Sequence, residues 1–306
     1  MKQATLDPDA LPMQAPVKAV KRDGWGALTA SELLLLGAIW GASFMFMRIA
    51  APSFGPLALV EVRLLLGALV LLPFLWRVRG ELNPRLLGAL AVIGIVNSAL
   101  PFSLFAWAAT FAPAGIGAIC NALAVLFTAV AATAFFGERL TPSRWFALAL
   151  GLLGVVLLAS ARIEGVNVPA AVVAGTTAAA LYGIGANLVR KYLAGALPPA
   201  AVAAATLGCA ALFMAPAAAF AWPEVMPGPK AWAAAVALGV LCTGLAYALF
   251  YRLIGKIGPA RAVMVTYLVP LFGAGWSWLL LDEPVTLAML AAGALILGSI
   301  AMSRRD

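Results

Sequence analysis

The sequence predicts an all-α integral membrane protein of ten transmembrane helices, arranged as two inverted five-helix repeats with both termini cytoplasmic. Three observations lead to this fold class. The 306 residues are 64% hydrophobic and 10% charged, whereas soluble domains are about 45–50% apolar and about 25% charged. The chain divides into ten apolar stretches, and chemically similar residues recur in the same order in the first five and the last five. The mean hydropathy of +1.02 means that lipid must cover most of this surface.

Each apolar stretch has a length that can cross a membrane, about 20 residues. Pro, Gly and clusters of charge separate the stretches, and the connecting segments are short. Because lipid offers the backbone no hydrogen bonds, runs of this length are expected to be helical. In chain order the ten predicted spans are residues 31–50, 56–76, 85–108, 112–136, 143–161, 170–191, 199–222, 230–253, 258–281 and 285–303.

The distribution of basic residues predicts the orientation. Residues 1–30 are polar and basic and contain no apolar core, so we expect a cytoplasmic N-terminal tail rather than a cleaved signal peptide. Alternate crossing from that side places sixteen of the 20 Lys and Arg residues in the cytoplasm, and only Arg162 and Lys230 outside. Basic residues accumulate in cytoplasmic loops of membrane proteins. This asymmetry therefore supports ten spans with both termini inside.

Residues of matching chemistry recur at a nearly constant spacing. Glu138 and Thr141 follow the fourth span, and Glu283 and Thr286, each 145 positions later, follow the ninth. The same spacing joins Ser98 to Thr243, Phe102 to Tyr247, Phe105 to Phe250 and Asn121 to Thr266, and a spacing of 142 joins Trp40-Gly41 and Arg48 to Tyr182-Gly183 and Arg190. We therefore predict two repeats, residues 31–161 and 170–303. An odd number of spans in each repeat inverts the second, and inverted repeats place a solute site near the membrane midplane.

The residue types argue against an enzyme. The chain has no His, which removes the usual base of Ser and Cys nucleophiles and the usual proton shuttle near neutral pH. Cys120, Cys209 and Cys242 fall in apolar stretches without metal-ligand spacing, so we expect no metal and no cofactor. The net charge of +8 is explained by membrane orientation rather than by nucleic acid. An integral membrane enzyme and a channel remain weaker alternatives to a carrier.

Aromatic and amide side chains in the middle of the spans predict a central cavity. Trp40 and Phe44, four residues apart, share one helix face. The predicted cavity residues are Trp40, Phe44, Asn97, Phe102, Phe105, Trp107, Asn121, Tyr182, Tyr247, Tyr251 and Tyr267. An apolar wall with a few hydroxyl and amide groups suits a small amphipathic solute such as an amino acid. Core packing is the alternative for each aromatic residue, and hydrogen bonding between helices is the alternative for each Asn.

Three charged residues, Arg48, Glu61 and Arg63, fall within or near spans. A charge at the centre of a membrane helix costs about 2.5–3.5 kcal/mol on insertion scales. Glu61 and Arg63 are two positions apart and cannot pair on one helix face, so Glu61 is a candidate partner of Arg48. Both a gating or substrate role and simple snorkelling to the interface are open for Arg48 and Glu61.

Four residues are predicted hinges. Proline removes a backbone hydrogen bond and bends a helix, and small residues let helices pack closely. The candidates are Pro101, Gly117, Pro259 and Pro270.

Two five-span halves that each close with an acidic turn, Gly137-Glu138 and Asp282-Glu283, resemble the drug/metabolite transporter superfamily, and within it the EamA type. Trp40-Gly41-Ala42-Ser43, Arg63 and Pro270 add to the resemblance, which covers residues 31–303. The second half departs from the first at Ala204 and Thr206, where Glu61 and Arg63 have no counterparts.

The resemblance implies a multi-pass protein of a bacterial-type inner membrane that exports amino acids and related metabolites by alternating access. Aromatic amino-acid exporters with ten spans are the nearest match, and a multidrug or other metabolite carrier of the same superfamily is the alternative. The implied partners are a small-molecule solute and the lipid bilayer, with no nucleic acid and no ATPase domain in this chain. Since Glu61 is the only plausible carboxylate in a span, we expect a facilitator-like carrier or a weakly coupled exporter.

Overall fold

The computed structural model describes residues 27–164 and 166–303, and the regular structure of these residues is helical throughout. The first half contains α1 (Ala27–Phe54), α2 (Pro56–Trp76), η1 (Arg79–Glu81), α3 (Pro84–Gly94), η2 (Ile95–Ala99), α4 (Leu100–Ala109), α5 (Ala114–Ala122), α6 (Ala124–Phe136) and α7 (Pro142–Ala159). The second half contains α8 (Val168–Tyr192), α9 (Pro199–Phe220), α10 (Pro229–Val236), η3 (Ala237–Leu245), α11 (Ala246–Ile257), α12 (Pro259–Ala262), η4 (Val263–Tyr267), α13 (Leu268–Leu281) and α14 (Leu287–Ser303).

Nine helical segments of the described residues are long and apolar enough to cross a membrane. They coincide with the first nine predicted spans apart from a few residues at their ends. The tenth predicted span is occupied by α14, an apolar helix of 17 residues. The prediction of an all-α integral membrane fold is confirmed. The tenth crossing and the cytoplasmic position of the termini remain predictions, and the N-terminal tail falls almost entirely outside the described residues.

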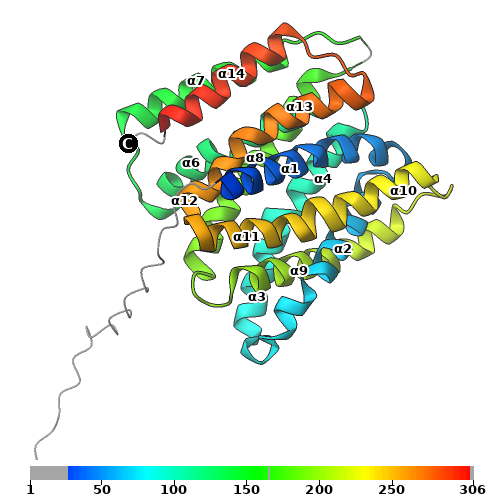
Figure 1. Ribbon diagram of the computed structural model, residues 1–306, viewed down its shortest axis with the longest axis vertical. Coiled ribbons are helices and arrows are strands. Elements are labelled where there is room, and N and C mark those ends of the chain that lie inside the picture. The colour runs from blue at the N-terminus through cyan, green and yellow to red at the C-terminus, as the bar shows by residue number, and fades with distance from the viewer. Residues whose placement is uncertain (1–26, 165, 304–306) are drawn as a thin grey trace, which may run out of the picture.

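Ion pairs at the helix ends fit alternate crossing of the bundle. Glu32, near the start of α1, lies 3.0 Å from Lys256 and 2.9 Å from Arg252 near the end of α11. Figure 1 shows that α1 begins and α14 ends at the same side of the bundle. We call this side the tail face and the opposite side, where α1 ends and α2 begins, the far face.

Contacts between helices follow a twofold pattern. The pairs α2 with α9 and α7 with α14 each join elements at equivalent positions of the two halves. In addition, α1 packs on α13 as α8 packs on α6. In Figure 1 the α7–α14 pair lies along one edge of the bundle, and α2 and α9 lie toward the other. This pattern supports an inverted repeat.

Departures from α-helix also recur at equivalent positions. The π-helical segments η2 and η3 interrupt the third and eighth spans, 145 positions apart at Ser98 and Thr243. Left-handed residues end α6 at Gly137, with φ 72°, and α13 at Asp282, with φ 52°. Glycine takes this conformation without strain, and Asp is one of the few other residues that tolerate it. The same turn is therefore built in both halves with different residues.

Glycine permits two close helix crossings between the halves. A Cβ atom added to Gly41 of α1 would lie 2.6 Å from Phe272 Cβ and 2.8 Å from the backbone nitrogen of Gly273. A Cβ atom added to Gly183 of α8 would lie 2.5 Å from the backbone carbon of Phe127. Small residues let membrane helices approach closely enough for extensive van der Waals contact. The crossings of α1 with α13 and of α8 with α6 therefore require Gly41 and Gly183.

Gly183→Ala is expected to destabilise the fold, because the added methyl group overlaps main-chain atoms of α6 that cannot move as a flexible side chain would. Overpacking of this kind costs about 1–3 kcal/mol, and the thermal unfolding midpoint in detergent should fall accordingly. Gly208→Ala in α9 is the matched control, because its methyl group would meet nothing within 4 Å. The control should keep or raise the midpoint; an equal fall in both variants would contradict the assigned crossing.

Candidate solute cavity

A cavity of about 210 Å³ lies among the middle turns of the long helices of both halves. This volume is below the roughly 300–1,000 Å³ of pockets for drug-sized ligands, so the cavity suits a smaller solute. Its lining residues are Trp40, Ser43, Phe44, Met47, Arg63, Phe102, Phe105, Asn121, Ala124, Val125, Tyr182, Cys242, Tyr247, Thr266 and Val269.

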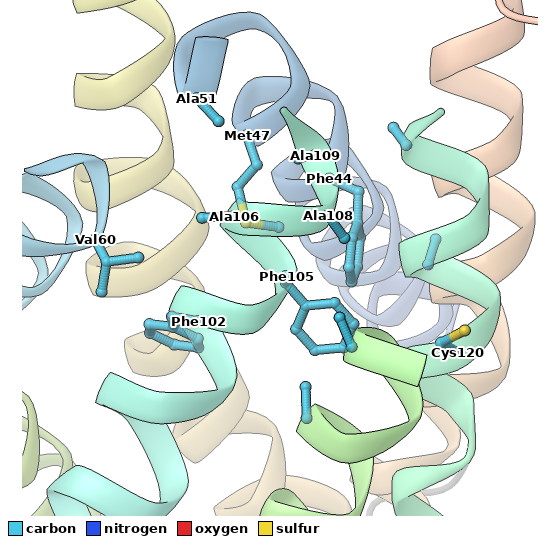
Figure 2. Packing of buried hydrophobic residues seen from close by; sticks show 14 of the residues in the cluster. Phe44, Met47, Ala51, Val60, Phe102, Phe105, Ala106, Ala108, Ala109 and Cys120 are labelled. Carbon is cyan, nitrogen blue, oxygen red and sulfur yellow. The ribbon is translucent and has the colours of Figure 1, made fainter. Parts of the chain in front are cut away.

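Aromatic rings from α1, α4, α8 and α11 form much of the cavity wall. Phe44 faces Phe105 nearly at right angles, with ring centroids 5.3 Å apart (Figure 2). The ring of Tyr182 lies 6.1 Å from that of Phe105, and the ring of Trp40 lies 6.2 Å from that of Tyr247. Aromatic pairs in such arrangements add about 0.5–1.5 kcal/mol beyond their buried area. These contacts fix the wall across the boundary between the two halves.

Among the residues that line the cavity, Arg63 is the charged one. It is 7% exposed, and its guanidinium carbon lies 3.5 Å from the ring centroid of Phe102, within the range of a cation–π interaction. Its Nε donates a hydrogen bond to Thr243 Oγ1 at 3.0 Å, and Nη1 lies 3.7 Å from the sulfur of Met47. These partners are all neutral, and no acidic side chain of residues 27–164 and 166–303 forms an ion pair with Arg63.

The π-helical segment η3 positions Thr243 against Arg63. The Thr243 hydroxyl donates to the carbonyl of Leu238, five residues earlier, at 2.9 Å. Both residues belong to the π-helical segment Ala237–Leu245, and such segments are frequent at functional sites. The hydroxyl thereby donates to the backbone while accepting from Arg63, which uses both of its hydrogen-bonding roles.

The structure brings seven of the predicted cavity residues together in the wall, Trp40, Phe44, Phe102, Phe105, Asn121, Tyr182 and Tyr247. The other four, Asn97, Trp107, Tyr251 and Tyr267, are not among the residues that line this cavity. Trp107 is 44% exposed and packs on Phe111, because two residues beyond Phe105 the helix has turned by about 200°. Asn97 lies against α8, where a Cβ atom added to Gly185 would be 2.7 Å from the Asn97 Cβ.

The remaining two predicted residues lie beside the cavity rather than in its wall. The Tyr251 ring stacks on that of Tyr247 at 6.1 Å, one turn further along α11. Tyr267 is half-buried at the end of η4 and packs against the core. Sequence reasoning did not select Ser43 and Met47, which do line the cavity. Their positions three and seven residues after Trp40 place them on its helix face, so helical periodicity was the available signal.

Arg48 does not contact Glu61, contrary to the candidate pairing. Its Nε lies 2.7 Å from Glu283 Oε1 in the turn after α13. Its Nη1 also donates to the carbonyl oxygens of Ala109 and Thr110, at 3.1 and 3.2 Å. The Arg48 side chain lies on the face of α1 that packs on α4 and α13, so its partner comes from a distant segment rather than from α2.

Glu283 also binds the start of α5. Its Oε2 accepts a hydrogen bond from the backbone nitrogen of Ala114 at 2.8 Å. A carboxylate at a helix N-terminus satisfies a backbone donor and interacts favourably with the helix dipole. We call Arg48, Glu283 and these backbone partners the far-face clamp. It joins the end of α1, the end of α4, the start of α5 and the turn after α13.

An equivalent ion pair lies at the tail face. Nη2 of Arg190 donates to Glu138 Oε1 at 2.5 Å and to Asn187 Oδ1 at 3.0 Å. Arg190 and Glu138 are 56% and 47% exposed, whereas Arg48 and Glu283 are 29% and 11% exposed. We call these three residues the tail-face clamp. Of the two clamps, the far-face clamp is more buried and makes more backbone hydrogen bonds.

A proline explains part of this difference. Pro259 begins α12 and stands 145 positions after Ala114, at the equivalent helix start. Proline has no backbone N–H. Glu138 therefore cannot receive at this position the backbone hydrogen bond that Glu283 receives from Ala114.

The gating role predicted for Glu61 and the hinge roles predicted for Pro101, Gly117 and Pro270 remain predictions. Glu61 is buried in α2, and its Oε2 has no hydrogen-bond partner among the described residues. Pro101 is the second residue of α4, which follows η2, and Pro270 is buried within α13. A Cβ atom added to Gly117 would lie 3.0 Å from the ring of Phe44 in the cavity wall.

Glu283→Gln is expected to lower the unfolding midpoint in detergent more than Glu138→Gln. Removing one partner of a buried pair costs about 3–5 kcal/mol, and an exposed pair contributes about 0–1 kcal/mol. The free-energy cost of Glu283→Gln in the half-buried far-face clamp should lie between these values. The cost of Glu138→Gln in the exposed tail-face clamp should lie near the lower one. Equal midpoints for the two variants would contradict the difference between the clamps.

Comparison with known proteins establishes the family. The profile of the EamA-like transporter family matches residues 25–160 and again residues 169–305. The chain belongs to the EamA-like transporter family. The predicted superfamily is thereby confirmed, and the chain is a multi-pass membrane transporter rather than a soluble protein.

Relatives of this EamA-like transporter are transporters by name. It is 26% identical over 277 residues to the probable amino-acid metabolite efflux pump of Escherichia coli (strain K12), covering 86% of this chain and 90% of the relative. It is 25% identical to the protein of the same name from Salmonella typhimurium, covering 92% and 94%. Over 138 residues it is 31% identical to the transporter YwfM of Bacillus subtilis, and this match spans 46% of that protein's length.

A solved structure shares the fold of this EamA-like transporter. The similarity has a TM-score of 0.63 and covers 90% of this chain and 96% of the other, at 22% identity. At that identity the likeness shows the fold alone.

Proposed function

We propose that this EamA-like transporter exports amino acids, aromatic or other small amphipathic ones, and related metabolites through its central cavity by alternating access, in a bacterial-type inner membrane. The cavity carries the proposal: a small enclosure with aromatic walls and a few polar groups, among them Asn121 and Tyr182. Such walls suit a solute with an apolar body and a polar end. The names of the Escherichia coli and Salmonella relatives support amino-acid metabolites as the solute class.

The two clamps provide a physical basis for alternating access. The far-face clamp joins α1, α4 and α5 of the first half to the turn after α13 of the second half. The tail-face clamp joins α8 of the second half to the turn after α6 of the first. Both clamps are formed in this structure, and rocking of one half against the other would open one face at a time. Opening the far face would require Arg48 and Glu283 to separate.

The proposed carrier moves its solute down a concentration gradient. The lining residues of the cavity include no carboxylate, and Glu61 is buried in α2 outside that wall. A carrier that couples transport to protons needs a titratable group along the solute path. We therefore assign no proton to the transport cycle.

Transport by purified protein in liposomes tests the cavity. Saturable counterflow of labelled amino acids is expected. Tyr247→Ala should reduce its rate at least about tenfold, because removing this ring from the cavity wall should cost at least about 1.4 kcal/mol of solute binding, which is a tenfold loss of affinity. Trp107→Ala is the matched control, since this ring lies outside the cavity, and it should retain transport. Absence of transport above empty liposomes for every amino acid would overturn the amino-acid assignment.

Dissipating the proton gradient should leave the initial rate of counterflow unchanged, because the cavity wall holds no carboxylate. The measurement compares uptake rates with and without a protonophore in liposomes that carry an imposed pH gradient. A severalfold fall in rate under the protonophore would overturn the facilitator mechanism while leaving the solute class intact.

A further inference from the structure

We propose that Arg63 is the carboxylate-binding residue of the cavity, and that it makes the cavity select aromatic carboxylates of net negative charge over zwitterions and cations with the same ring. This inference rests on the proposed transport through the cavity, and among amino acids and related metabolites it makes the related acids without an ammonium group the preferred solutes. The observation that leads to it is a buried guanidinium in the cavity wall whose partners are all neutral.

Arg63 forms no ion pair with the described acidic residues, Glu61 of the same helix included. Arginine remains protonated in proteins. The acidic residues of the clamps bind other arginines, Glu283 with Arg48 and Glu138 with Arg190. Glu32 binds basic residues of α11 at the tail face. Without a solute the cavity wall therefore carries one positive charge, and a carboxylate is the group that would neutralise it.

The geometry leaves the guanidinium a free edge for a ligand. Nε is bonded to Thr243 and Nη1 contacts the sulfur of Met47, whereas Nη2 makes no hydrogen bond to residues 27–164 and 166–303. The guanidinium lies against the Phe102 ring, which restricts its position. A thioether is a weak acceptor, and a carboxylate oxygen makes a charge-assisted bond that is about twice as strong as a neutral one. A carboxylate at Nη1 and Nη2 would thus replace a weak contact with strong ones.

The wall offers no carboxylate to pair with an ammonium group, and one of its aromatic faces, that of Phe102, is already covered by Arg63. Its polar members besides Arg63 are neutral, including Ser43, Asn121 and the two tyrosines. An ammonium in the cavity would add a second positive charge close to Arg63 in a medium of low dielectric, where like charges repel strongly. An aromatic acid without an amino group avoids this repulsion and still fills the aromatic wall.

The second half does not duplicate this positive charge. Thr206 stands at the position equivalent to Arg63, and its hydroxyl donates to the carbonyl of Val202 within α9, at 2.9 Å. The cavity therefore has one cation, on the α2 side, and it can orient a single carboxylate.

Three compounds with the same ring test the inference on the full-length protein: 3-phenylpropanoate, L-phenylalanine and 2-phenylethylamine. They carry a carboxylate, both groups and an ammonium, respectively. Binding is measured by quenching of tryptophan fluorescence and by inhibition of counterflow. We expect 3-phenylpropanoate to bind at least tenfold more tightly than L-phenylalanine, and 2-phenylethylamine to bind at least a hundredfold more weakly than the acid.

Substitution then assigns the preference to Arg63. R63Q should bring the affinities for the acid and L-phenylalanine within threefold of each other, and R63K should keep part of the preference. R162Q removes a positive charge from an exposed residue and is the matched control, which should keep the full preference. The wild-type series decides the ligand class even where R63Q does not fold.

Equal affinities for the three compounds in the wild type, or an unchanged acid preference in folded R63Q, would overturn the inference. Saturable transport of L-phenylalanine without discrimination against the amine would do so while leaving the proposed function in place. If no member of the series binds and no amino acid is transported, both proposals are overturned.

Discussion

The crossing of α1 with α13, repeated by the crossing of α8 with α6, is the contact on which the rest of the structure depends. Each crossing has a glycine where the two helices are in close contact, Gly41 or Gly183. The residue before each glycine, Trp40 or Tyr182, is thereby placed in the cavity wall. Seven residues, or about two turns, beyond each glycine lies the arginine of a clamp. One face of α1 and the matching face of α8 thus connect the cavity to opposite faces of the membrane.

The halves share a backbone plan but differ in chemistry at a few positions. Equivalent helices pack in equivalent pairs, and π-helical and left-handed residues recur at equivalent places. The differences concern Arg63 against Thr206 and Ala114 against Pro259. The first pair gives the cavity its single charge, and the second makes the two clamps unequal. The charge of the cavity and the inequality of the clamps therefore both come from positions at which the two halves differ.

The spans could be predicted because apolar length and the breaks at Pro and Gly are local signals. The aromatic wall could be predicted in part, since mid-span position identifies residues such as Phe105 but does not give the direction of each side chain. Trp107 was misplaced for that reason. The contact of Thr243 with Arg63 was not predicted, because the π-helical segment around Thr243 shifts the direction of side chains from that of a regular α-helix. The partner of Arg48 lies 235 residues away, and local spacing carries no information about such a contact.

Pro259 has a consequence for the kinetics of the proposed carrier. A state closed at the far face is stabilised by a backbone hydrogen bond that the opposite state cannot form at the equivalent helix start. Without solute, the conformational population is therefore biased toward far-face closure. A solute arriving at that face binds only the minor conformer, which lowers its apparent affinity by the fraction that is competent. The final distribution of solute across the membrane is unaffected, but half-saturation should require a higher concentration on the far side than on the tail side.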